Sequence, residues 1–252
     1  MIKEKLSIEK QEQPDFELTI TVNRHGPRPK DDRAGLTPEQ KEQIFNRTLD
    51  DYEGFDFSRE KNLKKRIVVS PKIRAGETAR ERQKALLHFG SAAVPIETDD
   101  RLSEGGVDYY DDLIAKDPEV DWFRQWYTGK ERPTPDVKLG REAAADYAEW
   151  LLDTIEQAKK SGGEQWVDAY SHAPAMAAFI LTLEDKLGID ITVPGLAGED
   201  RFTPARIARN FPLLGSFSIT ASSKTPEAVK LYLNGRNYDI SLKVIKDIAK
   251  KD

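Results

Sequence analysis

The chain has 252 residues, of which 38% are hydrophobic and 33% are charged, and its formal net charge is −5. This length and composition are typical of a soluble globular protein that buries one sizeable core. The mild acidic excess, with no basic run, argues against a general nucleic-acid-binding protein. The absence of cysteine excludes a disulfide framework, a thiolate metal site and a cysteine nucleophile.

The first sixteen residues are charged and contain no apolar run, so we expect no signal peptide. No stretch of the sequence approaches the roughly 20 apolar residues of a membrane helix. These features predict a cytoplasmic protein with neither nucleic acid nor membrane among its partners. We expect a single domain over residues 1–252, with an insertion at about 105–138.

The first half of the chain alternates predicted strands with predicted helices. Thr37, Pro38 and Gln40 form a helix start, with a capping threonine, a proline in the first turn and a glutamine that completes a capping box. In chain order, we predict a strand over 17–22, a helix over 37–49, a strand over 66–69, a helix ending near 87 and a short strand over 94–97.

The second half continues the alternation after the aromatic insertion. Asn234 and Gly235 are typical of the tight turn of a β-hairpin. In chain order, we predict a helix over 141–159, a strand over 166–170, a helix over 174–187, a strand over 216–221, a hairpin over 229–240 and a short basic helix.

This alternation predicts the α/β class, with three layers: a mostly parallel sheet and helices on both of its faces. Ligands of such sheets bind beyond the carboxyl ends of the strands. Polar side chains follow three of the predicted strands there. The first strand leads into Arg24 and His25, the second is followed by Arg74, and a later one leads into His172.

Two histidines among arginines suit phosphoryl transfer. Arginine offers a planar, permanently charged fork to phosphate oxygens, and a neutral imidazole can attack phosphorus and hold the group covalently. The third histidine, His88, lies late in a predicted helix, where a surface or capping role is expected. Without a metal-ligand cluster or a phosphate-binding glycine loop in the sequence, we expect no cofactor and no metal.

Five motifs in order resemble those of the histidine phosphatase superfamily, which has the phosphoglycerate-mutase-like fold. They are Arg-His-Gly at 24–26, the Ser-Pro-Lys-Ile-Arg-Ala element at 70–79, Arg-Leu-Ser-Glu at 101–104, Ser-His-Ala at 171–173 and the strand at 214–218. Residues 35–40 also resemble the helix start that follows the first motif in that family. The resemblance spans most of residues 17–221.

The resemblance implies a role for each matching residue. His25 would be the nucleophile that carries the phosphoryl group, while Arg24, Arg74 and His172 would bind its oxygens. Glu104 would be the general acid that protonates the leaving oxygen and then activates water. A solvated loop carboxylate is the alternative for Glu104, and its neighbouring rivals are Asp99, Asp100 and Asp108.

The sequence departs from the family pattern in two places. Arg28 follows Pro27, an arrangement closer to the acid-phosphatase and phytase branch, in which Arg28 would be a further phosphate ligand; a surface ion pair is the alternative. That branch usually carries aspartate after the second histidine, whereas here Ala173 follows His172. The combination leaves the branch open and favours Glu104 as the acid.

Three functions remain open at this stage. A metal-independent phosphatase acting on a phosphorylated small molecule or a phosphoprotein is the first, a phosphomutase of the phosphoglycerate mutase type is the second, and a non-catalytic phosphate-recognition module is the third. Substrate choice is expected to reside in 105–138 and 194–212. For the aromatic insertion, internal packing is favoured over lining a substrate pocket; for Arg201, Arg206 and Arg209, a solvated face is favoured over contact with a leaving group. The oligomeric state cannot be read from the sequence.

Overall fold

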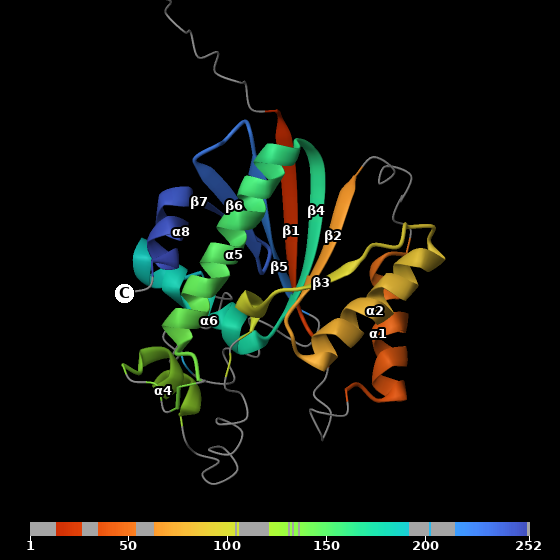
Figure 1. The fold of residues 1–252 in the computed structure, drawn as a ribbon, viewed down its shortest axis with the longest axis horizontal. Coiled ribbons are helices and arrows are strands. Elements are labelled where there is room, and N and C mark those ends of the chain that lie inside the picture. The colour runs from red at the N-terminus through yellow and green to blue at the C-terminus, as the bar shows by residue number, and fades with distance from the viewer. Residues whose placement is uncertain are drawn as a thin grey trace, which may run out of the picture.

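Seven strands form one mixed sheet in the order β3-β2-β4-β1-β5-β6-β7 (Figure 1). The computed structural model describes residues 14–26, 35–53, 63–103, 105, 121–130, 132, 134, 135, 137–191, 202 and 215–250. The strands are β1 (Phe16–Arg24), β2 (Lys64–Val69), β3 (Ile96–Thr98), β4 (Gly163–Ser171), β5 (Ser216–Ser222), β6 (Ala228–Leu233) and β7 (Arg236–Ser241).

The sheet has a parallel half and an antiparallel half. Strands β3, β2, β4 and β1 pair in parallel, whereas β5 pairs antiparallel with β1 and continues into the antiparallel pairs β5–β6 and β6–β7. The β1–β4 register aligns Arg24 with Ser171, and the β2–β4 register aligns Val69 with Tyr170. The carboxyl ends of β1, β2 and β4 therefore lie side by side.

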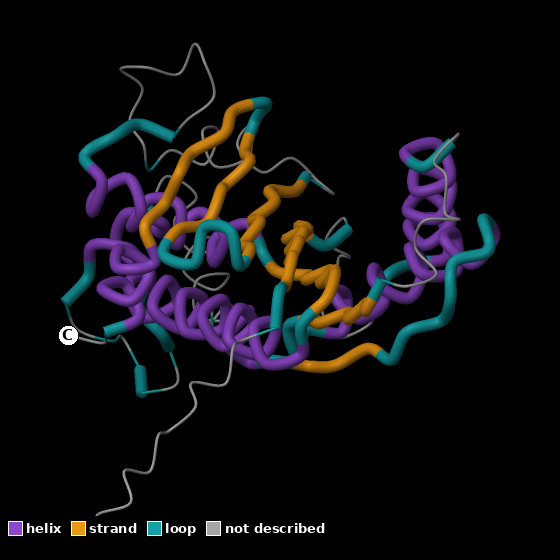
Figure 2. Tube along the Cα trace, turned by 90° about the horizontal axis from the view of Figure 1, so that it is seen from above, coloured by secondary structure: helices purple, strands orange, loops and turns teal. Residues whose placement is uncertain are grey.

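Helices cover both faces of the sheet, which confirms the predicted α/β layers (Figures 1 and 2). The helices are α1 (Pro38–Asp51), α2 (Ile73–His88), α4 (Trp122–Thr128), α5 (Gly140–Ser161), α6 (Ala173–Leu187) and α8 (Leu242–Ala249), with a 3₁₀ turn at Asp100–Leu102. The long helix α5, with α6 and α8, lies on one face of the sheet. The pair α1 and α2 lies on the other.

The two faces bury two separate apolar clusters because successive strand residues point to opposite sides. In β2, Val68 joins the large cluster under α5, α6 and α8, whereas Ile67 and Val69 join a smaller one with Ala75 and Ala79 of α2. The strand predicted over 66–69 is therefore present and is buried on both faces. The contacts of Ile67 and Val69 with Ala75 and Ala79 place the start of α2 over the carboxyl end of β2.

Local sequence signals explain several element boundaries. Thr37 accepts a hydrogen bond from the Gln40 amide at 3.3 Å, and the Gln40 side chain accepts one from the Thr37 amide at 2.9 Å. This is the predicted capping box of α1. Asn234 and Gly235 have φ angles of 52° and 78°, which confirms the predicted two-residue turn between β6 and β7.

The described part of the aromatic insertion packs against the main core. Phe123 and Trp126 of α4 are buried, and the Trp126 indole donates a hydrogen bond to the Lys138 carbonyl at 2.7 Å. Tyr127 donates its hydroxyl to Asp185 of α6 at 3.0 Å. The helix is therefore packed, as expected, but it packs into the main core and does not form a small core of its own. Among the helices in the described residues, none has both the length and the apolar character needed to cross a membrane.

Candidate active site

Arg24 and His25 are fixed where β1 ends between its two neighbours. The Arg24 amide donates to the Gly215 carbonyl at 2.8 Å, just before β5, and the His25 amide donates to the Ser171 carbonyl of β4 at 3.1 Å. Both bonds extend the sheet ladder by one residue on each side. The sheet itself therefore sets the direction in which these two side chains leave the backbone.

His172 lies at the corresponding position of the adjacent strand, between β4 and α6. Its ring centroid is 4.6 Å from that of His25, with 57° between the ring planes. His172 is fully buried and His25 is 5% exposed. The structure thus brings together two histidines that are 147 residues apart in the chain, at the sheet edge that the sequence predicted.

Arg74 approaches the same place from the start of α2. It is 6% exposed, and the proximity of its charge lowers the pKa of Arg24 after the larger effect of burial. Two guanidinium groups close to each other raise the local positive potential. Such a potential favours an anion, although the net charge of the chain is negative.

The same cations act on His172. Burial, then the nearby His25, Arg74, Lys72 and Arg24, hold the pKa of His172 well below its ordinary value. The ring is therefore neutral near neutral pH. The four predicted residues Arg24, His25, Arg74 and His172 share one electrostatic environment, as a common anion site requires.

The protonation of His25 follows from one contact. Its Nδ1 atom lies 2.5 Å from the Gly26 carbonyl oxygen. A carbonyl oxygen can only accept, so Nδ1 carries the proton and donates it. In the neutral ring, the lone pair is then on Nε2. That nitrogen can act as a nucleophile.

Two hydroxyl residues inside the 70–79 motif belong to the same cluster, and the sequence motifs alone do not indicate them. Thr78 accepts a hydrogen bond from the Gly26 amide at 3.0 Å and donates to the Arg74 carbonyl at 2.6 Å. Ser70 lies 2.7 Å from Nε2 of His172. Thr78 comes four residues after Arg74, which is about one helical turn. This spacing is the sequence feature that places Thr78 on the same side of the helix as Arg74.

Gly26 completes the Arg-His-Gly motif for a steric reason. A Cβ atom at this position would lie 2.6 Å from Cδ1 of Ile44 in α1, which is fully buried. A side chain at this position would therefore force the buried Ile44 side chain to shift.

We expect Gly26→Ala to lower the free energy of unfolding by about 1–3 kcal/mol, the usual cost of overpacking. Chemical denaturation measures this, and Ile44→Val in the same chain should restore part of the loss because it removes the clashing methyl group. Gly76→Ala is the matched control: its Cβ would meet nothing nearer than 3.9 Å, and alanine favours the helix. Equal effects of the two glycine substitutions would contradict the steric explanation.

The segment before Glu104 is held beside His172. The Ser171 hydroxyl donates to the Leu102 carbonyl at 2.8 Å, and Ser103 is buried. Of the rival carboxylates, Asp99 accepts two hydrogen bonds from the Arg101 side chain, at 3.0 and 2.8 Å. Burial raises the pKa of Asp99, but these bonds hold it below its ordinary value, so Asp99 is a poor proton donor.

Several predicted residues lie outside the described residues. These are Glu104, Arg28, Asp108, Arg201, Arg206 and Arg209, together with most of 105–120 and 194–212. Their predicted roles remain predictions. His88 ends α2 at the exposed surface, with its ring edge-on to Phe89, as expected for a residue outside the site.

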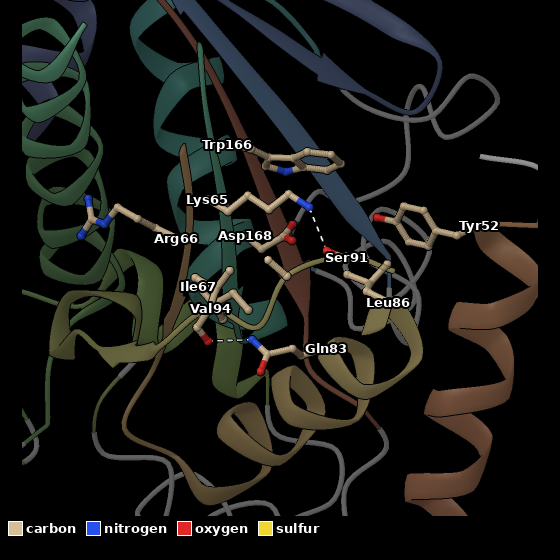
Figure 3. Close-up of a pocket in the computed structure, with 11 residues that line it drawn as sticks. Tyr52, Lys65, Arg66, Ile67, Gln83, Leu86, Ser91, Val94, Trp166 and Asp168 are labelled. Carbon is tan, nitrogen blue, oxygen red and sulfur yellow. Dashed lines mark hydrogen bonds between the residues drawn. The ribbon is translucent and has the colours of Figure 1, made fainter. Parts of the chain in front are cut away.

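A separate hollow lies under the second half of α2, towards the amino ends of β2 and β4 (Figure 3). Its lining includes Lys65 and Ile67 of β2, Gln83 and Leu86 of α2, and Trp166 of β4. Lys65 bonds Ser91 at 3.0 Å and Gln83 bonds the Val94 carbonyl at 2.7 Å across it. None of the predicted site residues lines this hollow. Among the described side chains, no group of three or more histidines and carboxylates is arranged to hold a metal ion.

The chain belongs to the histidine phosphatase superfamily, branch 1, whose family model matches residues 36–191. This match includes Arg74 and His172 but begins after Arg24 and His25. Their place in the site therefore rests on the sheet geometry and the motif. No curated protein matches the sequence.

Solved structures share the fold at low sequence identity. YhfR from Bacillus stearothermophilus has a TM-score of 0.54 and 17% identity, over 89% of this chain and 98% of that one. Phosphoglycerate mutase from Bacillus anthracis str. Sterne has a TM-score of 0.51 and 16% identity, over 94% of this chain and 98% of that one. A mycobacterial glucosyl-3-phosphoglycerate phosphatase in complex with VO3 has a TM-score of 0.51 and 14% identity, over 86% of this chain and 97% of that one. These likenesses establish the phosphoglycerate-mutase-like fold.

Proposed function

We propose that this protein is a phosphatase that hydrolyses a phosphate monoester through a covalent phosphohistidine on His25. The observation that carries the proposal is the pair of buried imidazoles, 4.6 Å apart, at adjacent strand ends beside two arginines. We further propose that its substrate is a phosphorylated small molecule and that residues 1–252 act as one domain.

The first step transfers the phosphoryl group to the enzyme. Nε2 of His25 uses its lone pair to form the N–P bond, while the bond between phosphorus and the leaving oxygen breaks. The hydrogen bond from Nδ1 to the Gly26 carbonyl stabilises the positive charge that develops on the ring. Arg24, Arg74 and His172 stabilise the charge on the phosphoryl oxygens in the transition state.

Glu104 is our proposed general acid and base. It protonates the leaving oxygen in the first step and takes a proton from the attacking water in the second, so that phosphate leaves and His25 is regenerated. The position of Leu102 and Ser103 beside Ser171 supports this role, and so does the engagement of Asp99 with Arg101.

Trapping of the covalent intermediate tests the proposal. With ³²P-labelled p-nitrophenyl phosphate and rapid quenching, wild-type protein should carry label that is stable in alkali and labile in acid. The His25→Ala protein should carry none. Turnover without any such label would contradict the mechanism.

The same intermediate distinguishes hydrolysis from mutase chemistry, since a mutase returns the phosphoryl group to a bound acceptor. Among the similar structures, one is named a phosphatase and another a mutase, so the shared fold does not choose between them. With 3-phosphoglycerate as substrate, we expect the rate of inorganic phosphate release to exceed the rate of isomerisation. ³¹P NMR measures both rates. The opposite order would favour the mutase.

A further inference from the structure

Ser70 is held in place by both its backbone and its side chain. It directly follows β2, is 1% exposed, and donates its amide to the Tyr170 carbonyl of β4 at 3.0 Å. Its Oγ atom lies 2.7 Å from Nε2 of the fully buried His172. The hydroxyl and the imidazole are thus fixed against each other by two neighbouring strands.

The direction of this hydrogen bond follows from the cost of burying a hydroxyl hydrogen without an acceptor. A buried hydroxyl hydrogen left without an acceptor is costly, so nearly all such groups donate. Within the part of the chain that the structure describes, the recorded hydrogen-bond partner of the Ser70 hydroxyl is Nε2 of His172. Among the described residues, that nitrogen is the acceptor in reach of the Ser70 hydroxyl, so we infer that it carries a lone pair.

A neutral imidazole has one N–H group and one lone pair. With the lone pair of His172 on Nε2, its proton is on Nδ1, and the ring can donate a hydrogen bond from that atom. The opposite tautomer would turn a lone pair towards a phosphoryl oxygen and repel it. Burial and the neighbouring cations hold the pKa of His172 well below its ordinary value. The ring therefore does not gain a second proton that would make both nitrogens donors.

We propose that Ser70 is a positioning residue that donates to Nε2 of His172 and thereby holds the proton of that ring on Nδ1, where it is available to a phosphoryl oxygen. The proposal rests on the proposed function, because it deepens the role of His172 at the same site. It explains why a serine stands at the end of β2, where its hydroxyl contacts the second histidine.

Nitrogen NMR of the ring tests the tautomer without any turnover. The chain has only three histidines, so a ¹⁵N-labelled protein gives six ring nitrogen signals, which His25→Asn and His88→Ala assign. We expect His172 in wild-type protein to be neutral and protonated on Nδ1. Inorganic phosphate should shift the Nδ1 signal. A wild-type His172 protonated on Nε2 would overturn the proposal, whatever the activity of the enzyme.

Ser70→Ala tests the consequence. We expect a mixture of the two His172 tautomers and a loss of about tenfold in kcat/KM for p-nitrophenyl phosphate. Ser70→Thr, which keeps a hydroxyl, should retain the wild-type tautomer. Thr154→Ala is the matched control, because it removes a buried hydroxyl bonded to the Trp150 carbonyl in α5, at 2.8 Å, and should change neither quantity.

The outcomes separate the two proposals. An unchanged His172 tautomer and unchanged kcat/KM in Ser70→Ala would refute the role of Ser70 while leaving the phosphohistidine mechanism intact. Full activity in His25→Ala would refute the mechanism, whereas the NMR result would still decide how Ser70 and His172 share their proton.

Discussion

Replacing His25 by alanine is expected to lower kcat for p-nitrophenyl phosphate by about 10⁴- to 10⁶-fold, the scale seen when a covalent nucleophile is removed. Nδ1 of the buried ring donates a hydrogen bond to the Gly26 carbonyl, which leaves the lone pair of the neutral ring on Nε2. No other described side chain in the cluster is prepared in this way, since Nε2 of His172 is bonded to Ser70. Steady-state kinetics at saturating substrate measure the loss.

His88→Ala is the control for this substitution. It removes the same ring from the exposed end of α2 and should leave kcat within about twofold. Circular dichroism establishes that both variants are folded. Activity of the His25 variant within tenfold of wild type would rule out His25 as the nucleophile.

Replacing Arg74 by alanine is expected to lower kcat/KM by about 10²- to 10³-fold, or 2.7–4 kcal/mol of transition-state stabilisation. Arg74 is buried, and its charge is close enough to Arg24 to lower the pKa of that guanidinium. Arg74→Lys should recover only part of the loss, because an ammonium group cannot bind two phosphoryl oxygens through a planar fork.

A matched control separates the loss of this charge from a general effect on α2. Arg80→Ala, on the exposed side of the same helix, is the matched control and should keep wild-type kcat/KM. An Arg74 variant with normal kcat/KM would remove this residue from the site.

Much of the fold could be predicted because its signals are local. The capping box at Thr37 and the Asn234–Gly235 turn depend on residues within four positions of one another, and both formed as expected. The run of 67–69 indicates burial on both faces by composition alone. The antiparallel half of the sheet was less accessible, because the side on which β5 joins β1 depends on contacts between segments about 200 residues apart.

The candidate site likewise has features that local sequence predicts and features that depend on distant contacts. The side chains at the strand ends could be predicted from local patterns, because Arg24, His25 and His172 each come at the end of a predicted strand. The positions of the histidine protons depend on contacts that form only in the folded chain. The Nδ1 proton of His25 depends on a carbonyl 2.5 Å away, and the tautomer of His172 depends on Ser70, which lies 102 residues earlier in the chain. A hydrogen bond requires atoms within about 3 Å of each other, and residue types or spacing along the chain cannot specify that distance between strands that meet only when the sheet forms.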